Sequence, residues 1–486
     1  AGSKNMKETK NVNKNAVFNT IKSICSIIYP LITFPYISRV LMRENVGKID
    51  FGASIISYFS LIASLGVTTY AVRECAKVRE DRSELSNMAS QIFSINLFST
   101  LIAYLALGVT LIVAKPLENY RLLICIQSAS ILFTTLGTDW INTAMEDFRY
   151  ITVRTVAVQC LSIVLLFLFI HRPEDYLKYA VISVIASSGA YLINIPYRRK
   201  FCDIRFTRNL NLKKHLPPIF LLFAMILSQT IYCNSDMTML GLMKDASEVG
   251  LYSTSVKIYN LVNTVIASVA WVVMPQLSEN FAKKNYDEIN RLLKYSLNFI
   301  IVLGLPCLAG LNVVTGAIIE VIAGRDFLGA VTSLHILTIA LLCSFIGGWM
   351  GNMIMIPSGR ESVCLRAGIV SALINIILNL VLIPRYGLNG AATTTAISEF
   401  LGICIQIPYM DKNIRVHGIW NMLKGPVLGV IAIGLIGTVC TSVFQSSFVI
   451  LAAAVLASAV VYLLILILVK NEFVMAFLAP VLHRKK

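Results

Sequence analysis

Apolar runs of about twenty residues alternate with short polar turns along most of the chain. A helix needs about 20 mostly apolar residues to cross the hydrocarbon core of a bilayer, which is roughly 30 Å thick. The pattern therefore predicts an all-α integral membrane protein with about 14 transmembrane helices. The predicted spans are 16–42, 46–70, 87–114, 117–138, 152–171, 175–197, 217–243, 248–276, 294–322, 330–357, 362–383, 388–410, 425–445 and 447–469.

The distribution of charge predicts how these spans are oriented. The 486-residue chain is 56% hydrophobic and only 14% charged, with a net charge of +16. Of its 42 Lys and Arg residues, 30 lie in the segments predicted on the side of the N-terminus and nine on the opposite side. Because Lys and Arg accumulate in cytoplasmic loops, we predict that both termini are cytoplasmic. The positive charge then follows from topology, and we predict no nucleic-acid partner.

A short internal similarity suggests a duplicated architecture. When Gly47 is superposed on Gly250, Val46 falls on Val249, and both glycines follow the turn between two long apolar segments. Parallel repeats of this kind are a recurring plan of transporters. We predict two six-helix lobes with two appended helices between flanking tails. The predicted ranges are a cytoplasmic tail at 1–15 (with 1–3 an expression scar), an N-terminal lobe at 16–197, a cytoplasmic linker at 198–216, a C-terminal lobe at 217–410, the last two spans at 425–469 and a cytoplasmic tail at 470–486.

Motifs of common enzyme classes are missing from the sequence. It contains no G-x-x-x-x-G-K-[ST], G-x-S-x-G, H-E-x-x-H or C-x-x-C pattern, and the loops on the predicted outer side are only a handful of residues long. ATP hydrolysis, serine-nucleophile chemistry and zinc chemistry therefore have no recognisable residues here. We predict no cofactor and no bound metal, and a chain that is a transporter and not an enzyme.

Ionisable residues inside the spans are the first candidates for function, because they are costly in lipid. Asp236 and Lys257 lie about eight and nine residues inside the predicted outer ends of neighbouring spans. They either form a structural ion pair or act on a ligand, and a pair that opens on binding would satisfy both interpretations. Arg39 and Lys22 lie near span ends, where a long side chain can also reach the membrane surface. Glu399 lies at mid-span, where it either binds a proton or hydrogen-bonds a neighbouring helix.

Several motifs together resemble the polysaccharide-transport family of Wzx-type flippases, within the multidrug/oligosaccharidyl-lipid/polysaccharide exporter superfamily. The resemblance covers nearly the whole chain. The motifs are Tyr29–Leu41 (YPLITFPYISRVL), Thr138–Trp140 (TDW), Glu146–Thr152 (EDFRYIT), Asn234–Asp236 (NSD), Glu248–Tyr252 (EVGLY) and Pro384–Ala392 (PRYGLNGAA).

This resemblance implies a multi-pass protein of the bacterial cytoplasmic membrane whose two lobes form a V around a central vestibule. The implied substrate is an undecaprenyl-pyrophosphate-linked oligosaccharide, which moves from the inner to the outer leaflet by alternating access. Membrane lipids, a polysaccharide polymerase and glycosyltransferases are the expected partners. A proton or sodium gradient is a candidate energy source. The glycan itself, whether of capsule, O-antigen or teichoic type, is not specified.

Within that framework the candidate residues take roles. We predict that Arg39, Lys257 and Lys22 bind the pyrophosphate, because guanidinium and ammonium groups recognise phosphate. Asp236 and Glu399 are candidates for ion coupling, or in the case of Asp236 for a switch with Lys257. Aromatic and amide side chains that face a vestibule would suit sugar rings, although most such residues serve packing. The candidates for lining are Asn234, Tyr259, Asn260, Asn263 and Tyr36.

Two alternatives remain from the sequence. A cation or drug antiporter of the same fold would need acids in its cavity, whereas the buried set includes Arg39 and Lys257. A membrane glycan polymerase or ligase would need a sizeable catalytic loop on the outer side, and the loops there are short.

Overall fold

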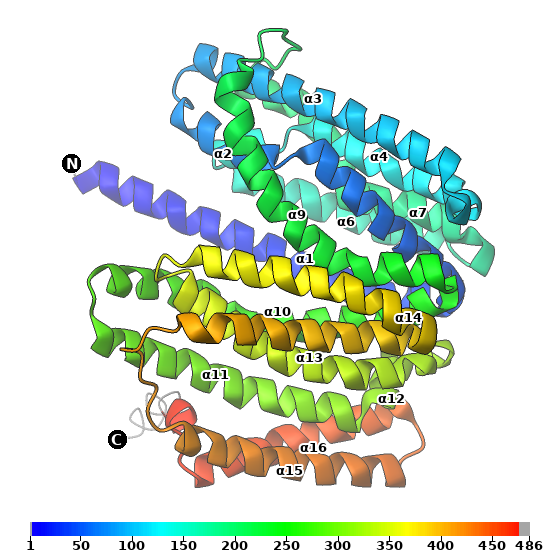
Figure 1. Ribbon diagram of the computed structural model, residues 1–486, viewed down its shortest axis with the longest axis vertical. Coiled ribbons are helices and arrows are strands. Elements are labelled where there is room, and N and C mark those ends of the chain that lie inside the picture. The colour runs from blue at the N-terminus through cyan, green and yellow to red at the C-terminus, as the bar shows by residue number, and fades with distance from the viewer. Residues whose placement is uncertain (1, 476–486) are drawn as a thin grey trace. The chain divides into compact units, whose positions relative to one another are not determined.

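The computed structural model describes residues 2–475, without the side chains of residues 2–14 and 16, as helices joined by short connections (Figure 1). The chain divides into two compact units, unit 1 up to Leu242 and unit 2 from Met243. Twelve helical stretches among the described residues are long and apolar enough to cross a bilayer. The predicted all-α membrane architecture is confirmed, whereas the V-shaped arrangement of two lobes stays a prediction.

The helices of each unit follow the predicted spans closely. Those of unit 1 are α1 (Gly2–Ser64), α2 (Val67–Lys77), α3 (Arg82–Val113), η1 (Lys115–Tyr120), α4 (Arg121–Gly137), α5 (Trp140–Ala144), α6 (Phe148–Phe169), η2 (Pro173–Asp175), α7 (Tyr176–Val184), η3 (Ile185–Gly189), α8 (Ala190–Tyr197), η4 (Arg198–Lys200) and α9 (Leu212–Met243), which ends at the boundary. Those of unit 2 are α10 (Ala246–Ala282), α11 (Tyr286–Val313), α12 (Thr315–Ile322), η5 (Arg325–Ala330), α13 (Val331–Met350), η6 (Gly351–Met355), α14 (Glu361–Gln406), η7 (Ile407–Tyr409), α15 (Ile419–Val443) and α16 (Ser447–Leu468).

Two of the twelve stretches contain a sharp turn and cross twice, which accounts for the fourteen predicted crossings. A straight helix with the 63 residues of α1 would be about 95 Å long, three times the hydrocarbon thickness. Its backbone leaves the helical region at Met42, and that of α14 does so at Gly387. A Cβ on Gly390 would lie 2.4 Å from the carbonyl oxygen of Leu382, a contact that eight residues of straight helix could not make. In Figure 1 the chain of α1 runs away from the N-terminus and then turns back toward α2.

One predicted span is interrupted in the structure. The sequence predicts a single helix over 294–322, but α11 ends at Val313 and α12 begins at Thr315. His335 from α13 lies at the break, with Nε2 at 3.2 Å from the Asn312 carbonyl oxygen and 2.7 Å from Thr315 Oγ1. A side chain that bonds a backbone oxygen at the break compensates for lost helical hydrogen bonds. The continuous hydrophobic run does not reveal this break, because the break depends on a contact from another helix.

In each unit one side chain holds a hairpin turn by a hydrogen bond to its backbone, as donor in unit 1 and as acceptor in unit 2. In unit 1, Asn45 Nδ2 donates to the Pro173 carbonyl oxygen at 2.8 Å, in the turn between α6 and α7. In unit 2, the Leu388 N–H donates to Glu248 Oε2 at 2.8 Å, in the turn of α14. The superposition of Gly47 on Gly250 places Asn45 on Glu248. The internal similarity thus coincides with an equivalent structural position in each unit.

The segment predicted as a linker lies ordered along α3. The backbone N–H groups of residues 203, 205 and 207 donate to the hydroxyls of Ser86, Ser90 and Ser94 at 3.1, 3.1 and 2.9 Å. Two residues of extended chain advance about 6.6 Å and four residues of helix advance about 6 Å. The backbone donors of the segment therefore stay aligned with the serine hydroxyls of α3. The segment is therefore fastened to unit 1. The predicted lobe and linker boundaries rest on the sequence repeat and stay a prediction.

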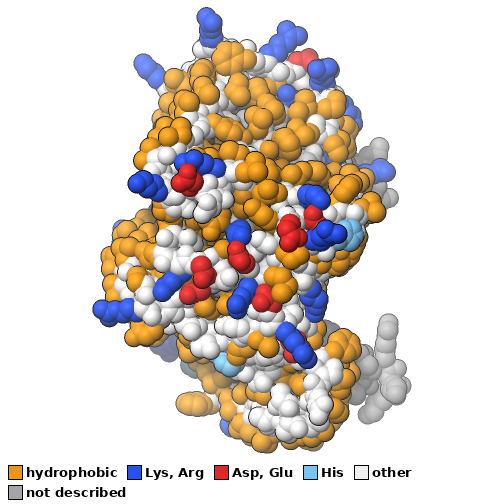
Figure 2. All heavy atoms as spheres, turned by 90° about the vertical axis from the view of Figure 1, so that its right-hand side faces the viewer, with side chains coloured by type: hydrophobic (Ala, Val, Ile, Leu, Met, Phe, Trp, Pro, Cys, Tyr) orange, Lys and Arg blue, Asp and Glu red, His pale blue; other side chains and the backbone are white. Residues whose placement is uncertain are grey.

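Acidic and basic side chains occur together on the surface of the helical turns. Figure 2 shows acidic and basic side chains together on the side that lies to the right in Figure 1. A mixed surface is expected for the side that the Lys and Arg distribution predicts to be outer. The orientation in the membrane stays a prediction.

We predict that Gly387→Ala destabilises the protein by at least about 1–2 kcal/mol, because its φ of +55° is a conformation that favours glycine. A Cβ there would also lie 2.1 Å from Glu248 Oε2. Thermal unfolding in detergent, followed by tryptophan fluorescence, measures the change. Gly368→Ala in the same helix is the control, since a Cβ there meets nothing within 4 Å. An equal loss in both variants would contradict the role of this turn.

Candidate functional site

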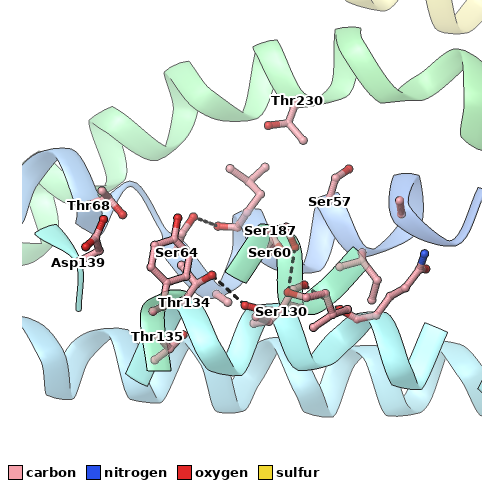
Figure 3. Close-up of a pocket in the computed structure, with 18 of the residues that line it drawn as sticks. Ser57, Ser60, Ser64, Thr68, Ser130, Thr134, Thr135, Asp139, Ser187 and Thr230 are labelled. Carbon is pink, nitrogen blue, oxygen red and sulfur yellow. Dashed lines mark hydrogen bonds between the residues drawn. The ribbon is translucent and has the colours of Figure 1, made fainter. Parts of the chain in front are cut away.

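Unit 1 contains a polar cavity of about 630 Å³ among its membrane-spanning helices (Figure 3). Its lining comes from the second half of α1, from α4, from the α7–η3–α8 segment and from α9, with contributions from α2, α3 and α5. This volume lies within the range of about 300–1,000 Å³ that is typical of small-ligand sites. Hydroxyl and amide side chains make up much of the wall, in a part of the protein where lipid offers no hydrogen bonds.

The polar lining follows the helical repeat. Four helical segments each contribute two polar side chains four residues apart, which places both on one face of the helix. These pairs are Ser60 and Ser64, Ser130 and Thr134, Ser183 and Ser187, and Thr230 and Asn234. The charged residues of the sequence do not reveal this cavity. The pattern that indicates it is the pairs of hydroxyl residues four positions apart in otherwise apolar helices.

Six of the hydroxyls in the described lining use their proton within their own helix. Each donates to a backbone carbonyl oxygen three or four residues earlier, as serine and threonine commonly do in helices. Their oxygen lone pairs remain as acceptors, so these six hydroxyls present acceptors to the cavity. The six bonds are Ser57 to Ser54 at 2.6 Å, Ser64 to Leu61 at 3.2 Å, Ser130 to Gln127 at 2.7 Å, Thr134 to Ser130 at 2.8 Å, Ser183 to Ala180 at 2.8 Å and Ser187 to Val184 at 3.2 Å.

Asp139 is the one charged side chain among the described residues that line the cavity. It lies with Thr68 at one end of the cavity (Figure 3). Its Oδ1 accepts a hydrogen bond from Nη2 of Arg154, whose side chain is only 2% exposed against 21% for Asp139. Thr138 ends α4 in a left-handed conformation, with φ at +44°, and this turns the following residue out of the helix. Arg198 Nη1 holds that turn by donating to Thr138 Oγ1 at 2.7 Å.

The motif that follows Asp139 is held by contacts between helices. Glu146 accepts a hydrogen bond from Arg79 Nη1 at 2.7 Å, and this carboxylate raises the pKa of the Arg79 guanidinium. Asp147 accepts one from the Tyr197 hydroxyl at 2.6 Å, and the Tyr197 ring stacks on Tyr150 with centroids 3.4 Å apart. These residues therefore fix the connection between α5 and α6 beside the cavity.

Two predicted lining residues of unit 1 have different positions. Asn234 lines the cavity, as predicted, and its Nδ2 donates to the Thr230 carbonyl oxygen at 3.0 Å. Tyr36 is absent from the described lining of this cavity, and its hydroxyl donates to the Ile170 carbonyl oxygen at 2.7 Å. Asp236 is 7% exposed, which agrees with its predicted burial. The coupling role of Asp236 stays a prediction.

The predicted phosphate ligands are spread over both units. Arg39 is exposed, and its Nη1 donates to the Pro35 carbonyl oxygen at 2.6 Å. Lys22 in unit 1 and Lys257 in unit 2 are partly exposed. The lining of the unit 1 cavity includes neither Arg39 nor Lys22. Joint binding of one anion by Arg39 and Lys257 stays a prediction.

Unit 2 brings two of the predicted residues together. The Tyr259 hydroxyl donates to Glu399 Oε1 at 3.5 Å, which links α10 to the second half of α14. Asn263 lines a smaller cavity of about 160 Å³ beside Trp349, whereas Asn260 is exposed. The hydrogen bond to Glu399 fits the interpretation of this acid as a residue that bonds a neighbouring helix.

An apolar hollow in unit 2 has the opposite chemistry. It measures about 410 Å³ and is lined mostly by aliphatic side chains of α11, α15 and α16. Its tyrosine, Tyr462, uses the hydroxyl to donate to the Val302 carbonyl oxygen at 2.7 Å. Such a surface suits a hydrocarbon chain and offers little to a sugar or a phosphate.

Comparisons with known proteins agree with these features. A putative O-antigen transporter of Shigella dysenteriae is 19% identical over 392 residues, which cover 80% of this chain and 97% of that protein. The capsular polysaccharide biosynthesis protein CapF of Staphylococcus aureus is 24% identical over 414 residues, 83% of this chain and 99% of that protein. The solved structure of the lipid II flippase MurJ in an inward closed conformation matches with a TM-score of 0.73 at 17% identity, over 96% of this chain and 100% of that one. This last likeness shows a shared fold.

The family model described as polysaccharide biosynthesis protein matches residues 12–281, more than half of the chain. This match includes the hairpin of α1, the cavity of unit 1 and the Glu248 motif. It confirms the resemblance seen in the sequence. The chain belongs to the polysaccharide biosynthesis protein family.

Proposed function

We propose that this protein is a flippase that moves a lipid-linked oligosaccharide across the membrane by alternating access. The observation that carries the proposal is the hydroxyl-lined cavity inside a membrane-spanning unit. A glycan crossing a bilayer loses its hydrogen bonds to water, and lipid cannot replace them. A polar cavity in the protein can replace them. The names of the Shigella and Staphylococcus relatives, an O-antigen transporter and a capsular polysaccharide protein, support the same class of substrate.

The proposed carrier is undecaprenyl pyrophosphate in a bacterial cytoplasmic membrane, with both termini of the protein in the cytoplasm. The apolar hollow of unit 2 supports a hydrocarbon carrier, because it would bind a prenyl chain with little loss of hydrogen bonding. Arg39, Lys257 and Lys22 are the proposed ligands of the pyrophosphate. A polymerase and glycosyltransferases are the proposed partners that consume and supply the substrate.

The proposed driving force is electrical, with a proton or sodium ion as the coupling candidate at Asp236 or Glu399. A negative cell interior favours outward movement of an anion, by about 2.3 kcal/mol per charge per 100 mV. A pyrophosphate carries enough charge for this contribution to matter.

A cation or drug antiporter fits the cavity less well. Cationic substrates are held by acids, and the one acid among the described lining residues, Asp139, is already bonded to Arg154. The function is tested in proteoliposomes with a fluorescent lipid-linked oligosaccharide. Transfer of the intact molecule between leaflets supports a flippase, whereas a lengthened or transferred glycan would support a polymerase or ligase. No transfer by folded protein would contradict the proposal.

We expect Arg39→Ala and Lys257→Ala each to reduce transport at least about tenfold, because a charge-assisted hydrogen bond to phosphate contributes about 1.5–3 kcal/mol. The same proteoliposome assay measures the rate. Lys283→Ala is the control, since Lys283 forms an exposed pair with Glu279 within α10 and the following turn. Full activity in both Arg39→Ala and Lys257→Ala, with folding preserved, would contradict their assignment to the pyrophosphate.

We also expect the transport rate to rise when a potassium diffusion potential makes the inner side negative. If Asp236 or Glu399 couples an ion, Asp236→Asn or Glu399→Gln abolishes the response to a proton or sodium gradient but keeps the response to voltage. The measurement compares rates under each gradient separately. A rate that ignores both voltage and ion gradients would exclude electrical and ionic coupling alike.

A further inference from the structure

The cavity of unit 1 is selective in its hydrogen-bonding chemistry, which the proposed function alone does not specify. Six of its hydroxyls donate to their own helix, as described above, and present acceptor lone pairs to the interior. The oxygens of a pyrophosphate are acceptors only, so these six hydroxyls offer them no proton. Sugar hydroxyl and amine groups are donors, and they match these acceptors.

The charge of the cavity lining also favours a sugar over a pyrophosphate. The described lining includes no Lys or Arg, and its one charged side chain is the carboxylate of Asp139. Arg154, the counter-charge, is 2% exposed in its side chain and does not line the cavity. A ligand in the cavity therefore meets the carboxylate and not the guanidinium. A pyrophosphate would find no cationic partner on the described lining, whereas donor groups of a sugar would find the acceptor oxygens of the carboxylate.

Arg154 also fixes the position of that carboxylate. Its Nη2 holds Oδ1 of Asp139, and its guanidinium lies over the Tyr150 ring at 5.1 Å. The other carboxylate oxygen of Asp139 remains available to accept from a ligand. Trp140 and Tyr191 line the same region, and aromatic rings pack well against the apolar face of a sugar.

We propose that this cavity binds the sugar part of the lipid-linked substrate and excludes its pyrophosphate, with Asp139 as a specificity-determining residue for neutral and amino sugars over acidic ones. The assignment of this ligand to transport rests on the proposed function. The binding itself is a property of unit 1. Arg154 acts as a positioning residue, since it holds Asp139 and does not line the cavity.

The test measures binding of free saccharides to the full-length protein in detergent. Trp140 lines the cavity and is 4% exposed, so its emission reports occupancy, and Trp140→Phe identifies its part of the signal. The probes are maltotriose, chitosan trisaccharide, a glucuronic acid trisaccharide and inorganic pyrophosphate. We expect saturable changes with the first two, weaker binding of the third and no response to, or competition by, pyrophosphate.

Two variants separate binding from folding. In Asp139→Asn/Arg154→Gln both charges of the buried pair are removed together, because a lone buried charge would destabilise the protein. We expect at least about a tenfold loss of affinity for chitosan trisaccharide, the value of one charged hydrogen bond. In Ser130→Ala/Thr134→Ala two wall acceptors are removed, and we expect a several-fold loss for both probes. Thr110→Ala is the control, since Thr110 makes the same bond to its own helix outside the cavity.

The binding and transport measurements distinguish failure of the sugar site from failure of the proposed function. A Trp140 response to pyrophosphate, no response to any saccharide, or unchanged affinity in the wall variant would overturn the proposal. If Asp139→Asn/Arg154→Gln does not fold, the affinity of Ser130→Ala/Thr134→Ala for the saccharides tests the proposal. Saccharide binding without lipid-linked transport in proteoliposomes would reject the proposed function and leave the sugar site standing. Transport without saccharide binding would reject the sugar site alone.

Discussion

A polar group inside a bilayer must find its hydrogen-bond partner within the protein, and this constraint shapes the whole chain. Helices satisfy their backbones internally, and serine and threonine satisfy their hydroxyls on the preceding turn. Ser130 and Thr134 illustrate this, since both donate within α4 while facing the cavity. An apolar helix can therefore carry a polar stripe without a partner from another helix. The same local bonds that make the stripe tolerable also make its surface an acceptor surface.

Where the helices end or break, partners come from elsewhere in the fold. Asn45 and Glu248 each bind backbone in a hairpin turn of their own unit. His335 bonds the backbone at the break between α11 and α12. Three serines of α3 accept backbone N–H groups from the segment that precedes α9. Motif residues that suggest chemistry in the sequence can therefore serve the turns of the chain, as Glu248 does.

The hollow of unit 1 and the apolar hollow of unit 2 differ in their chemistry. The hollow of unit 1 is lined by hydroxyls and one paired carboxylate, and that of unit 2 by aliphatic side chains. A sugar gains hydrogen bonds only in the first, and a hydrocarbon chain gains apolar contact in the second. Each unit thus offers a surface of a different polarity.

By itself the sequence determined the fold class, the fourteen crossings and the family, because hydrophobicity over twenty residues is a local property that lipid imposes directly. It also indicated the burial of Asp236. It did not reveal the cavity. Ser60, Ser130, Ser183 and Thr230 are far apart in the chain, and only packing brings their faces together. The pairing of Asp139 with Arg154 was equally hidden, since it depends on the left-handed turn at Thr138 and on the approach of α6. The membrane spans follow from the hydrophobicity of each segment by itself. A site depends on which helices pack against one another, and the tertiary structure decides this packing.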